Sequence, residues 1–368
     1  MTDIVHIISG LGGGGAENTL AQLAPRLAKN GMSQTVISLT GDGVIAGRLE
    51  AEGIPVVRLD FRSVRSRASN FIRLLSHIHS MRPKFLQGWM YHGDLAATAA
   101  HMLAPGKKNR QLVWGIRCSN MDIERNGKLV RWGAIFSNIP DAVVANSEVG
   151  VNVHTLHGYR PRRLEVISNG VNLDHFRPDS RERARLRQKF GLSDDAVVAI
   201  HTARVDPMKD HQTLLIATES VRGLNLVLVG QGTREFLASY PNVCGKVQAL
   251  GRREDIASLL TVGDIIVSSS AYGEGFSNAL AEGMAAGLVP VATDVGDSEK
   301  IMGDTGILIP PNDPSALAHA LTQLVSIPHD DLRRRGLLAR KRIKDEFDIK
   351  RMTDRFVDLY IDLSKIQM

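Results

Sequence analysis

Two glutamates that could grip hydroxyl groups, Glu274 and Glu282, stand close together in the second half of the chain. They belong to a glycine-containing stretch, residues 270–284, in which Ser277 or Asn278 could open a helix. Glu274 would then lie in the loop ahead of the helix, and Glu282 one or two turns inside it. Carboxylates accept hydrogen bonds from neighbouring hydroxyls, and the free N–H groups of a helix N-terminus favour an anion. The spacing therefore indicates a site that holds one hydroxylated, anionic ligand at two places.

Two cations occur in an earlier loop, residues 202–210, directly after a predicted strand. Arg204 offers a planar fork of N–H donors and Lys209 a compact point charge, a combination suited to a diphosphate. The alternative, for these residues taken alone, is two solvated loop cations. Together with the two glutamates, they favour a ligand that carries both phosphates and hydroxyls.

A run rich in glycine, residues 10–15, follows the first predicted strand. It satisfies the spacing G-x-G-x-x-G, so a nicotinamide or flavin dinucleotide site is the first alternative. Such a site needs an acid at the end of the second strand, where Leu39 and Thr40 stand, whereas Asp42 comes later in a turn. Two further interpretations are a tight turn that needs glycine for backbone room, and an anion or sugar site at a helix N-terminus. We prefer the last, because the second half of the chain supplies a nucleotide site.

The elements that must position these loops alternate between strands and helices. Short apolar runs rich in β-branched residues predict buried parallel strands. They lie at residues 4–8, 35–39, 55–58, 85–87, 112–116, 142–145 and 164–167 in the first half, and at 197–200, 226–229, 247–250, 265–268, 289–292 and 307–309 in the second. Helical patterns fill most of the gaps, which implies an α/β protein with two doubly wound parallel sheets. In such sheets ligands bind beyond the carboxyl ends of the strands.

Length and composition fit two soluble domains. A chain of 368 residues, 43 % apolar and 23 % charged, is an ordinary globular mixture. It contains no run approaching the roughly 20 apolar residues of a membrane span and no basic region typical of a signal peptide, so a cytoplasmic protein is expected. Cys118 and Cys244 are far apart, which argues against a disulfide framework or a zinc site. The net charge of +6 suggests an anionic partner.

The order and spacing of these motifs resemble the retaining glycosyltransferases of the GT-B fold, specifically the large family 4. The resemblance covers nearly the whole chain and is densest over residues 204–306. The matching pieces are Gly14-Gly15-Ala16-Glu17, Asn169-Gly170-Val171-Asn172, Arg204 with Lys209-Asp210, Val229-Gly230-Gln231-Gly232, Leu250-Gly251-Arg252 with Asp255-Ile256, the E-x7-E pair Glu274 and Glu282, and Val291-Ala292-Thr293-Asp294-Val295-Gly296. Ser168, Phe276-Ser277 and Gln231 depart from the family pattern, which bears on donor details more than on the fold.

The resemblance implies two Rossmann-like domains that face each other across a cleft. Residues 1–170 would form the acceptor side, and residues 171–348 would bind the nucleotide-sugar donor. A C-terminal helix, residues 349–368, would cross back onto the first domain; the alternative is a helix that caps the second domain.

Roles for individual residues also follow from the resemblance. Arg204 and Lys209 would neutralise the donor diphosphate, Glu282 would hold the ribose, and Glu274 would contact the transferred sugar. Backbone N–H groups of Gly275, Phe276, Ser277 and Asn278 would help to cradle phosphate. In the first domain, Gly14 and Gly15 would let their loop approach the diphosphate, and His92 would lie near the sugar.

The implied reaction moves a hexosyl or N-acetylhexosaminyl group, with retention, from a UDP-linked donor to an acceptor. The acceptor would be a saccharide or a lipid-linked precursor in polysaccharide or glycoconjugate synthesis. The leaving phosphate would take the acceptor proton on the same face, with Glu274 positioning the sugar. The sequence shows no metal-ligand cluster, so no metal is expected. The resemblance also implies no cofactor besides the nucleotide-sugar donor and no nucleic-acid partner. An NAD(P)-dependent oxidoreductase and a non-catalytic sugar-binding protein of the same fold stay as alternatives.

A basic segment, residues 61–84, contains no acid and has apolar residues at helical spacing. Its cations are Arg62, Arg65, Arg67, Arg73, Arg82 and Lys84. One interpretation is a helix that packs on the sheet and leaves its arginines solvated. The other is peripheral docking on the anionic inner face of the cell membrane, with Ile72 and Leu74 inserted shallowly.

Overall fold

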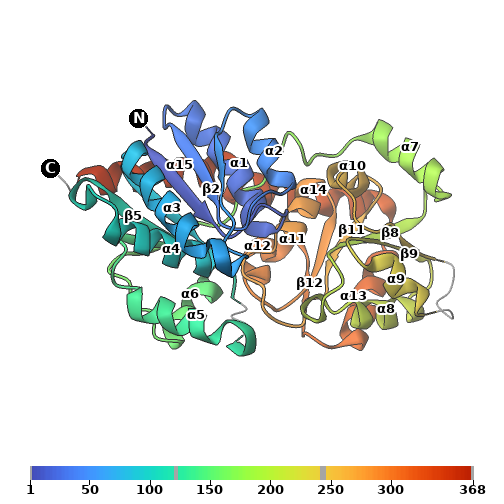
Figure 1. The fold of residues 1–368 in the computed structure, drawn as a ribbon. Coiled ribbons are helices and arrows are strands. Elements are labelled where there is room, and N and C mark those ends of the chain that lie inside the picture. The colour runs from blue at the N-terminus through green and yellow to red at the C-terminus, as the bar shows by residue number, and fades with distance from the viewer. Residues whose placement is uncertain (1, 120–122, 241–245, 366–368) are drawn as a thin grey trace. The chain divides into compact units, whose positions relative to one another are not determined.

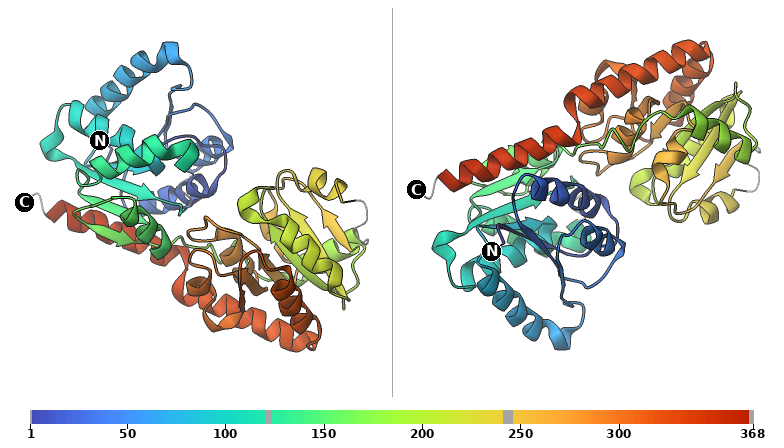
Figure 2. Two further views of the ribbon diagram at one scale, coloured as in Figure 1. Left: turned by 90° about the horizontal axis from the view of Figure 1, so that it is seen from below. Right: turned by 90° about the horizontal axis from the view of Figure 1, so that it is seen from above.

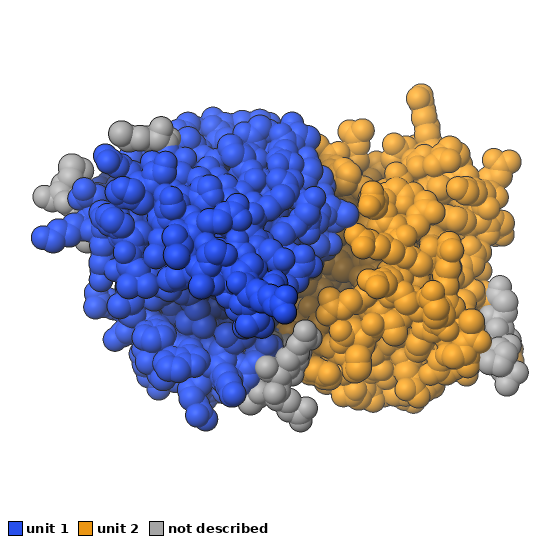
Figure 3. Space-filling view, viewed as in Figure 1, with its two compact units in different colours: residues 1–170, 349–368 blue, residues 171–348 orange. Residues whose placement is uncertain are grey.

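The computed structural model describes residues 2–119, 123–240 and 246–365. They form two compact units, each built on its own parallel sheet (Figure 1). Unit 1 comprises residues 1–170 and 349–368, and unit 2 comprises residues 171–348; Figure 3 colours them separately. Cys118 is a free thiol, while Cys244 lies outside the described residues.

Unit 1 contains a seven-stranded parallel sheet in the order β3-β2-β1-β4-β5-β6-β7. Its strands are β1 (Ile4–Ile8), β2 (Gln34–Ser38), β3 (Val56–Arg58), β4 (Phe85–Trp89), β5 (Gln111–Ile116), β6 (Ala142–Ala145) and β7 (Leu164–Val166). The strand order reverses between β1 and β4, so the switch point of this sheet lies there. These two strands are paired along their whole length, from Ile4 opposite Phe85 to Ile8 opposite Trp89.

Helices cover both faces of this sheet because alternate strand residues point to opposite sides. The helices are α1 (Gly15–Lys29), α2 (Val44–Ala51), α3 (Arg67–Met81), α4 (Met90–Leu103), α5 (Ile123–Phe136), α6 (Glu148–Leu156) and α15 (Ile349–Lys365), with short 3-10 turns η1 (Val64–Ser66) and η2 (Lys107–Asn109). Ile4 and Ile8 join a core with α1, α2 and α15. Val5 and Ile7 join a second core with α3, α4 and α5.

The C-terminal helix α15 packs in unit 1, along the strands on the β5 to β7 side of the sheet (Figure 2). Its apolar face is buried through residues at helical spacing: Ile349, Met352, Phe356, Leu359, Tyr360 and Leu363. The Tyr360 hydroxyl donates to Gln87 Oε1 at 3.1 Å, and Arg355 Nη1 donates to the Val166 carbonyl at 2.7 Å. The helix is therefore part of the unit 1 core.

Unit 2 contains a six-stranded parallel sheet in the order β10-β9-β8-β11-β12-β13. Its strands are β8 (Val197–Thr202), β9 (Leu224–Val229), β10 (Val247–Ala249), β11 (Ile265–Ser268), β12 (Val289–Thr293) and β13 (Ile307–Ile309). Here the switch point lies between β8 and β11. These strands pair only at Ala199 and Ile200 of β8, opposite Ile265 and Ile266 of β11. Every strand that the sequence predicts is present in the two sheets.

The helices of unit 2 again form two layers. They are α7 (Ser180–Phe190), α8 (His211–Ser220), α9 (Thr233–Ala238), α10 (Ile256–Leu260), α11 (Asn278–Ala285), α12 (Ser298–Met302), α13 (Pro314–Val325) and α14 (His329–Glu346), with 3-10 turns η3 (Pro207–Lys209) and η4 (Gly303–Thr305). One core joins the sheet to α7, α10, α11, α12 and α14. The other joins it to α8 and α13.

The basic segment 61–84 forms η1 and the predicted helix, α3. Leu74 is completely buried in the unit 1 core, so its expected insertion into a lipid surface is wrong; Ile72, in contrast, is 66 % exposed. Among the helices of the described residues, none is both long and apolar enough to span a membrane.

Candidate functional site

The switch point of unit 2 brings the loops after β8 and β11 together. Past Ile200 the two strands no longer pair, and the ring of His201 donates from Nδ1 to the Val267 carbonyl at 3.0 Å instead. Burial lowers the pKa of His201 to about 3, so this ring is neutral. Further on, Ala271 N–H donates to the Met208 carbonyl at 2.8 Å, and Ser269 Oγ donates to the Lys209 carbonyl at 2.9 Å. The carboxyl edge of the sheet is thus tied by loop contacts after the strands have separated.

An ion pair occupies this edge. Lys209 Nζ contacts Glu274 Oε1, and Ser270 Oγ donates to the same oxygen at 2.7 Å. Glu274 is only 7 % exposed. Ser270 is itself held through its carbonyl, which accepts a 2.7 Å hydrogen bond from Thr293 Oγ1. The resemblance implied that Lys209 contacts the diphosphate and that Glu274 contacts the sugar. In the structure the two side chains instead form an ion pair and neutralise each other.

Arg204 does not join this pair. Its guanidinium donates from Nη2 to Asp206 Oδ2 at 3.0 Å, and 62 % of its side chain is exposed. Asp206 also accepts from the Met208 N–H at 3.0 Å and so caps η3. Burial acts to raise the pKa of Asp206, but the Met208 N–H and Arg204 outweigh it and the pKa is lowered. Each of the two predicted diphosphate ligands thus has its own carboxylate partner.

Glu282 lies on α11, which starts at Asn278 with Ser277 as N-cap. The helix packs closely on the sheet, since a Cβ at Gly283 would come within 2.4 Å of Ile266. Glu282 is half-buried, and its carboxyl has no hydrogen-bond partner among the described residues. Burial raises its pKa to about 8. The structure therefore does not join Glu282 to Glu274; it leaves a largely protonated carboxyl in the second turn of the helix.

The segment between Glu274 and Glu282 is held by backbone contacts to the loop that follows β12. The Gly275 carbonyl accepts from the Asp297 N–H at 3.0 Å, and Gly296, at φ 65°, would bring a Cβ within 2.6 Å of it. Phe276 is 5 % exposed, and its ring packs on Phe347 with centroids 5.4 Å apart. The side chain of Phe276 is thus a core residue, and the backbone is what this segment can offer a ligand.

Residues that the sequence analysis did not single out complete the edge. Ser270 and Thr293 support Glu274, and the serine run directly after β11 is the only sequence signal for them. Gly230 is needed at its position, because a Cβ there would lie 1.9 Å from the Ala203 carbonyl oxygen. That close approach lets the Val205 N–H reach the Gln231 carbonyl at 2.8 Å and fixes the loop that carries Arg204.

In unit 1 the glycine loop leads into α1, with Gly14 as N-cap and Gly15 as the first helical residue. The Glu17 carboxylate folds back onto this N-terminus, within reach of the Gly14 N–H, and burial raises its pKa despite that contact. An external anion at this end of α1 must therefore displace Glu17. Asp42, the first acid after the second strand, is engaged by Arg58, whose Nε lies 3.0 Å from Asp42 Oδ1.

His92 lies in unit 1, at the carboxyl end of β4, in the first turn of α4. It is exposed, and the chain enters the helix through Met90 at φ 62°. Nearby Asp94 is buried and accepts from the Gly115 N–H at 3.0 Å. Burial raises the pKa of Asp94 well above its ordinary value. His92 and the glycine loop thus flank the switch point of unit 1, as Lys209 and Glu274 flank that of unit 2.

Among residues 2–119, 123–240 and 246–365, no group of three or more His, Cys, Asp or Glu side chains is placed to hold a metal ion.

Sequence relatives agree with this architecture. A model of Glycosyltransferase Family 4 matches residues 13–175, and one of Glycosyl transferases group 1 matches residues 196–326. EpsD of Bacillus subtilis, named as a glycosyltransferase, is 30 % identical over 229 residues, which are 59 % of either chain. A D-inositol 3-phosphate glycosyltransferase of a Mycobacterium species is 28 % identical over 200 residues, 50 % of this chain and 45 % of that one. The matches thus span about half the length of these curated relatives.

Solved structures share the fold over nearly the whole chain. Anabaena HepE, solved in complex with UDP, superposes with a TM-score of 0.86 at 19 % identity, over 98 % of this chain and 100 % of that one. Sucrose-phosphate synthase of Thermosynechococcus elongatus gives a TM-score of 0.84 at 19 % identity, over 98 % and 99 %. Two Rossmann-like units with parallel sheets of this order define the GT-B class. Within that class the chain belongs to the family 4 glycosyltransferases.

Proposed function

We propose that the protein is a retaining glycosyltransferase that uses a UDP-linked sugar. Unit 2 binds the donor and unit 1 binds the acceptor. The observation that carries this proposal is the Lys209–Glu274 pair, supported by Ser270, at the switch point of unit 2 and next to the start of α11. HepE, a structural neighbour, was solved with UDP and with UDP-glucose, which supports the choice of nucleotide.

Donor binding exchanges one partner of Lys209 for another. The diphosphate is a stronger attraction for the ammonium than a single carboxylate, because it carries more charge on more oxygens. Once Lys209 turns to the diphosphate, Glu274 is free to accept hydrogen bonds from the hydroxyls of the transferred sugar. Arg204 adds a second, more exposed cation. Backbone N–H groups at the start of α11 add further donors.

Glu282 holds the nucleotide ribose in this proposal. A protonated carboxyl both donates and accepts a hydrogen bond, so the raised pKa suits contact with vicinal hydroxyls at neutral pH. The predicted roles of Gly275, Ser277 and Asn278 are those of backbone donors to phosphate.

Chemistry follows on one face of the sugar. The bond from the anomeric carbon to the leaving phosphate oxygen breaks, and the acceptor oxygen bonds to that carbon from the same side. The acceptor proton passes to the leaving phosphate. Lys209 and Arg204 stabilise the charge that grows on the diphosphate, without a metal ion. His92 and the loop of Gly14 and Gly15 contact the sugar and acceptor from unit 1.

We further propose that the acceptor is a saccharide or lipid-linked precursor in polysaccharide synthesis and that residues 61–84 dock on the inner face of the cell membrane. Val64 and Ile72 are 73 % and 66 % exposed in this basic segment. Arg65 and its neighbours would supply the attraction to anionic lipid.

Nucleotide binding and turnover test the function. Thermal unfolding is measured with UDP, GDP, ADP and NADH, and slow hydrolysis of UDP-sugars is followed by release of UDP. We expect stabilisation by UDP and turnover of one UDP-sugar, whose released sugar keeps its anomeric configuration in NMR spectra. Stabilisation by NADH alone would favour an oxidoreductase, and UDP binding without turnover of any UDP-sugar would favour a non-catalytic binding protein.

A further inference from the structure

Arg117 is a buried cation at the carboxyl edge of the unit 1 sheet. It directly follows β5, the neighbour of β4, and is 8 % exposed. It thus lies one strand away from the switch point flanked by His92 and the glycine loop, on the edge where parallel sheets bind ligands.

The contacts of Arg117 leave one side of its guanidinium unused. Nη1 donates to Asn169 Oδ1 at 3.2 Å, and the group lies over the rings of Trp89 and Phe356, 4.8 and 5.4 Å from their centroids. Nε and Nη2 have no hydrogen-bond partner among the described residues. These two nitrogens share one edge of the guanidinium, the edge that grips a carboxylate or phosphate with two parallel hydrogen bonds.

The charge of Arg117 is poorly compensated inside the protein. Burial lowers its pKa to about 10, so it stays charged at neutral pH. The carboxyl that interacts with it, Asp94, is itself buried with a strongly raised pKa, so it does not supply a full countercharge. Tyr360, the other ionisable group facing Arg117, has a raised pKa and is neutral. A buried charge without a partner destabilises a fold, which calls for a function.

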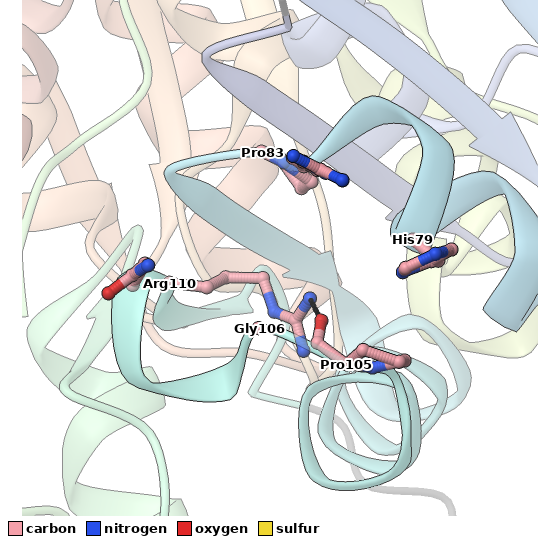
Figure 4. A pocket seen from close by; sticks show the side chains of 7 residues that line it. His79, Pro83, Pro105, Gly106 and Arg110 are labelled. Carbon is pink, nitrogen blue, oxygen red and sulfur yellow. Dashed lines mark hydrogen bonds between the residues drawn. The ribbon is translucent and has the colours of Figure 1, made fainter.

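The two other buried arginines of the described residues use both terminal nitrogens, although the Nε of Arg110 also has no hydrogen-bond partner. Arg110, 3 % exposed, borders a cavity of about 290 Å³ at the opposite edge of the same sheet (Figure 4). Its Nη2 donates to the carbonyls of Ala100, His101 and Ala104, and its Nη1 donates to that of Pro105, which caps the end of α4. Arg187 in unit 2 pairs with Asp264 at 2.8 Å. Arg117 has neither kind of partner.

We propose that Arg117 binds an anionic group, a phosphate or a carboxylate, on the acceptor substrate. This specifies the acceptor class and rests on the proposed function. The two free N–H groups make a bidentate contact to the oxyanion, and the aromatic rings exclude water from it. Asn146 follows β6, donates to the Arg117 carbonyl at 3.5 Å, and has an Oδ1 without a partner. That oxygen accepts a hydroxyl of the same ligand.

Anion binding to the full chain tests the proposal. Thermal unfolding is followed during titration with inorganic phosphate and, separately, acetate, for the wild type, Arg117→Met, Arg117→Lys and the control Arg110→Met. We expect one of the two anions to stabilise the wild type. Its apparent Kd should rise at least about tenfold in Arg117→Met, and less in Arg117→Lys, which keeps the charge but loses the fork.

The stability of the unliganded variants separates binding from structure. Arg117→Met should unfold at the same or a higher temperature than the wild type, since it removes an uncompensated charge. Arg110→Met should unfold earlier and keep its anion response. The proposal is overturned if neither anion stabilises the wild type, or if Arg117→Met responds as strongly as the wild type.

A UDP titration of the same variants keeps the two proposals apart. We expect Arg117→Met to retain stabilisation by UDP, because the donor residues belong to unit 2. Loss of anion binding with UDP binding intact supports the acceptor assignment. A wild type that ignores UDP but binds phosphate through Arg117 would refute the donor site and leave an anion site in unit 1.

Discussion

The two sheets share one strand order over six strands, to which unit 1 adds β7, but they differ at their switch points. In unit 1, β1 and β4 are paired to their last residues, Ile8 and Trp89. In unit 2, β8 and β11 pair at two positions only, and the side chain of His201 takes the carbonyl of Val267 beyond them. Early separation makes room for side chains between the strand ends. This is where Lys209 meets Glu274.

The electrostatics of the two edges differ in the same way. Unit 2 carries cations that already have carboxylate partners, Lys209 with Glu274 and Arg204 with Asp206. Unit 1 carries Arg117, whose Nε and Nη2 have no hydrogen-bond partner among the described residues. A cation that already has a carboxylate partner can exchange that partner for an anionic ligand. A cation without a carboxylate partner gains a countercharge only when a ligand binds. The comparison teaches that the same topology can carry opposite charge arrangements at its carboxyl edge.

The largest effect should come from breaking the pair of unit 2 with Lys209→Met. Removing one member of an ion pair leaves an uncompensated charge and lowers the free energy of unfolding by about 3–5 kcal/mol when both members are deeply buried. Because Lys209 is partly exposed, we expect a loss of about 2 kcal/mol. UDP-sugar turnover should fall about 100-fold or more. Denaturant unfolding and steady-state kinetics measure the two effects.

Two further variants serve as controls for this prediction. Lys209→Arg should retain most of the stability, and the double variant Lys209→Met with Glu274→Gln should regain stability but not turnover. Wild-type stability in Lys209→Met would show that the pair is not formed.

Arg204→Ala compares the exposed ion pair of unit 2 with the buried Lys209–Glu274 pair. Its side chain is 62 % exposed, so loss of its contact with Asp206 should change stability by less than about 1 kcal/mol. Turnover should fall roughly tenfold, less than for Lys209→Met, because solvent screens its contribution to the leaving group. Steady-state kinetics of the two variants are measured in parallel. A larger loss of turnover in Arg204→Ala than in Lys209→Met would contradict the roles assigned to these two cations.

The pH dependence of stability tests the environment of Glu282. Its pKa is raised from 4.5 to about 8, so the folded state holds the proton more tightly than the unfolded state. The stabilisation of the folded state by the protonated Glu282 carboxyl is fully present below pH 4.5 and is lost as the pH rises through 8. Glu282→Gln should therefore gain about 1–3 kcal/mol over the wild type at pH 9 and show no such gain at pH 4. Equal stability curves across this range would mean that Glu282 is solvated.

The smallest effect concerns the surface of unit 1. Arg65→Glu with Arg67→Glu should weaken sedimentation with anionic vesicles at low salt, at about 1 kcal/mol for each charge near the surface. Fold stability should hardly change, because both arginines are exposed. Equal sedimentation of the wild type with neutral and anionic vesicles would show that α3 only covers the sheet.

The strands were predictable because buried parallel strands are short, continuous and β-branched, and glycine or a polar turn bounds each of them. The pairing of Lys209 with Glu274 was not, because 65 residues separate them and only the adjacency of β8 and β11 brings them together. Leu74 was misplaced since a shift of two positions on a helix moves a side chain from the solvent to the core. Arg117 follows an apolar strand like many loop residues, and the sequence alone does not reveal that its fork is buried and unused.

The return of α15 to unit 1 sets an order on synthesis. Residues 171–348 emerge from the ribosome before residues 349–365, so unit 2 can finish folding while unit 1 still lacks part of its core. At roughly 5–20 residues per second, that interval lasts about 10–40 s. During it, the sheet face that later meets Phe356 and Tyr360 stays open to water. A nascent chain of this protein thus carries unit 1 incomplete until residues 349–365 have emerged, and chaperones would have most to protect before that point.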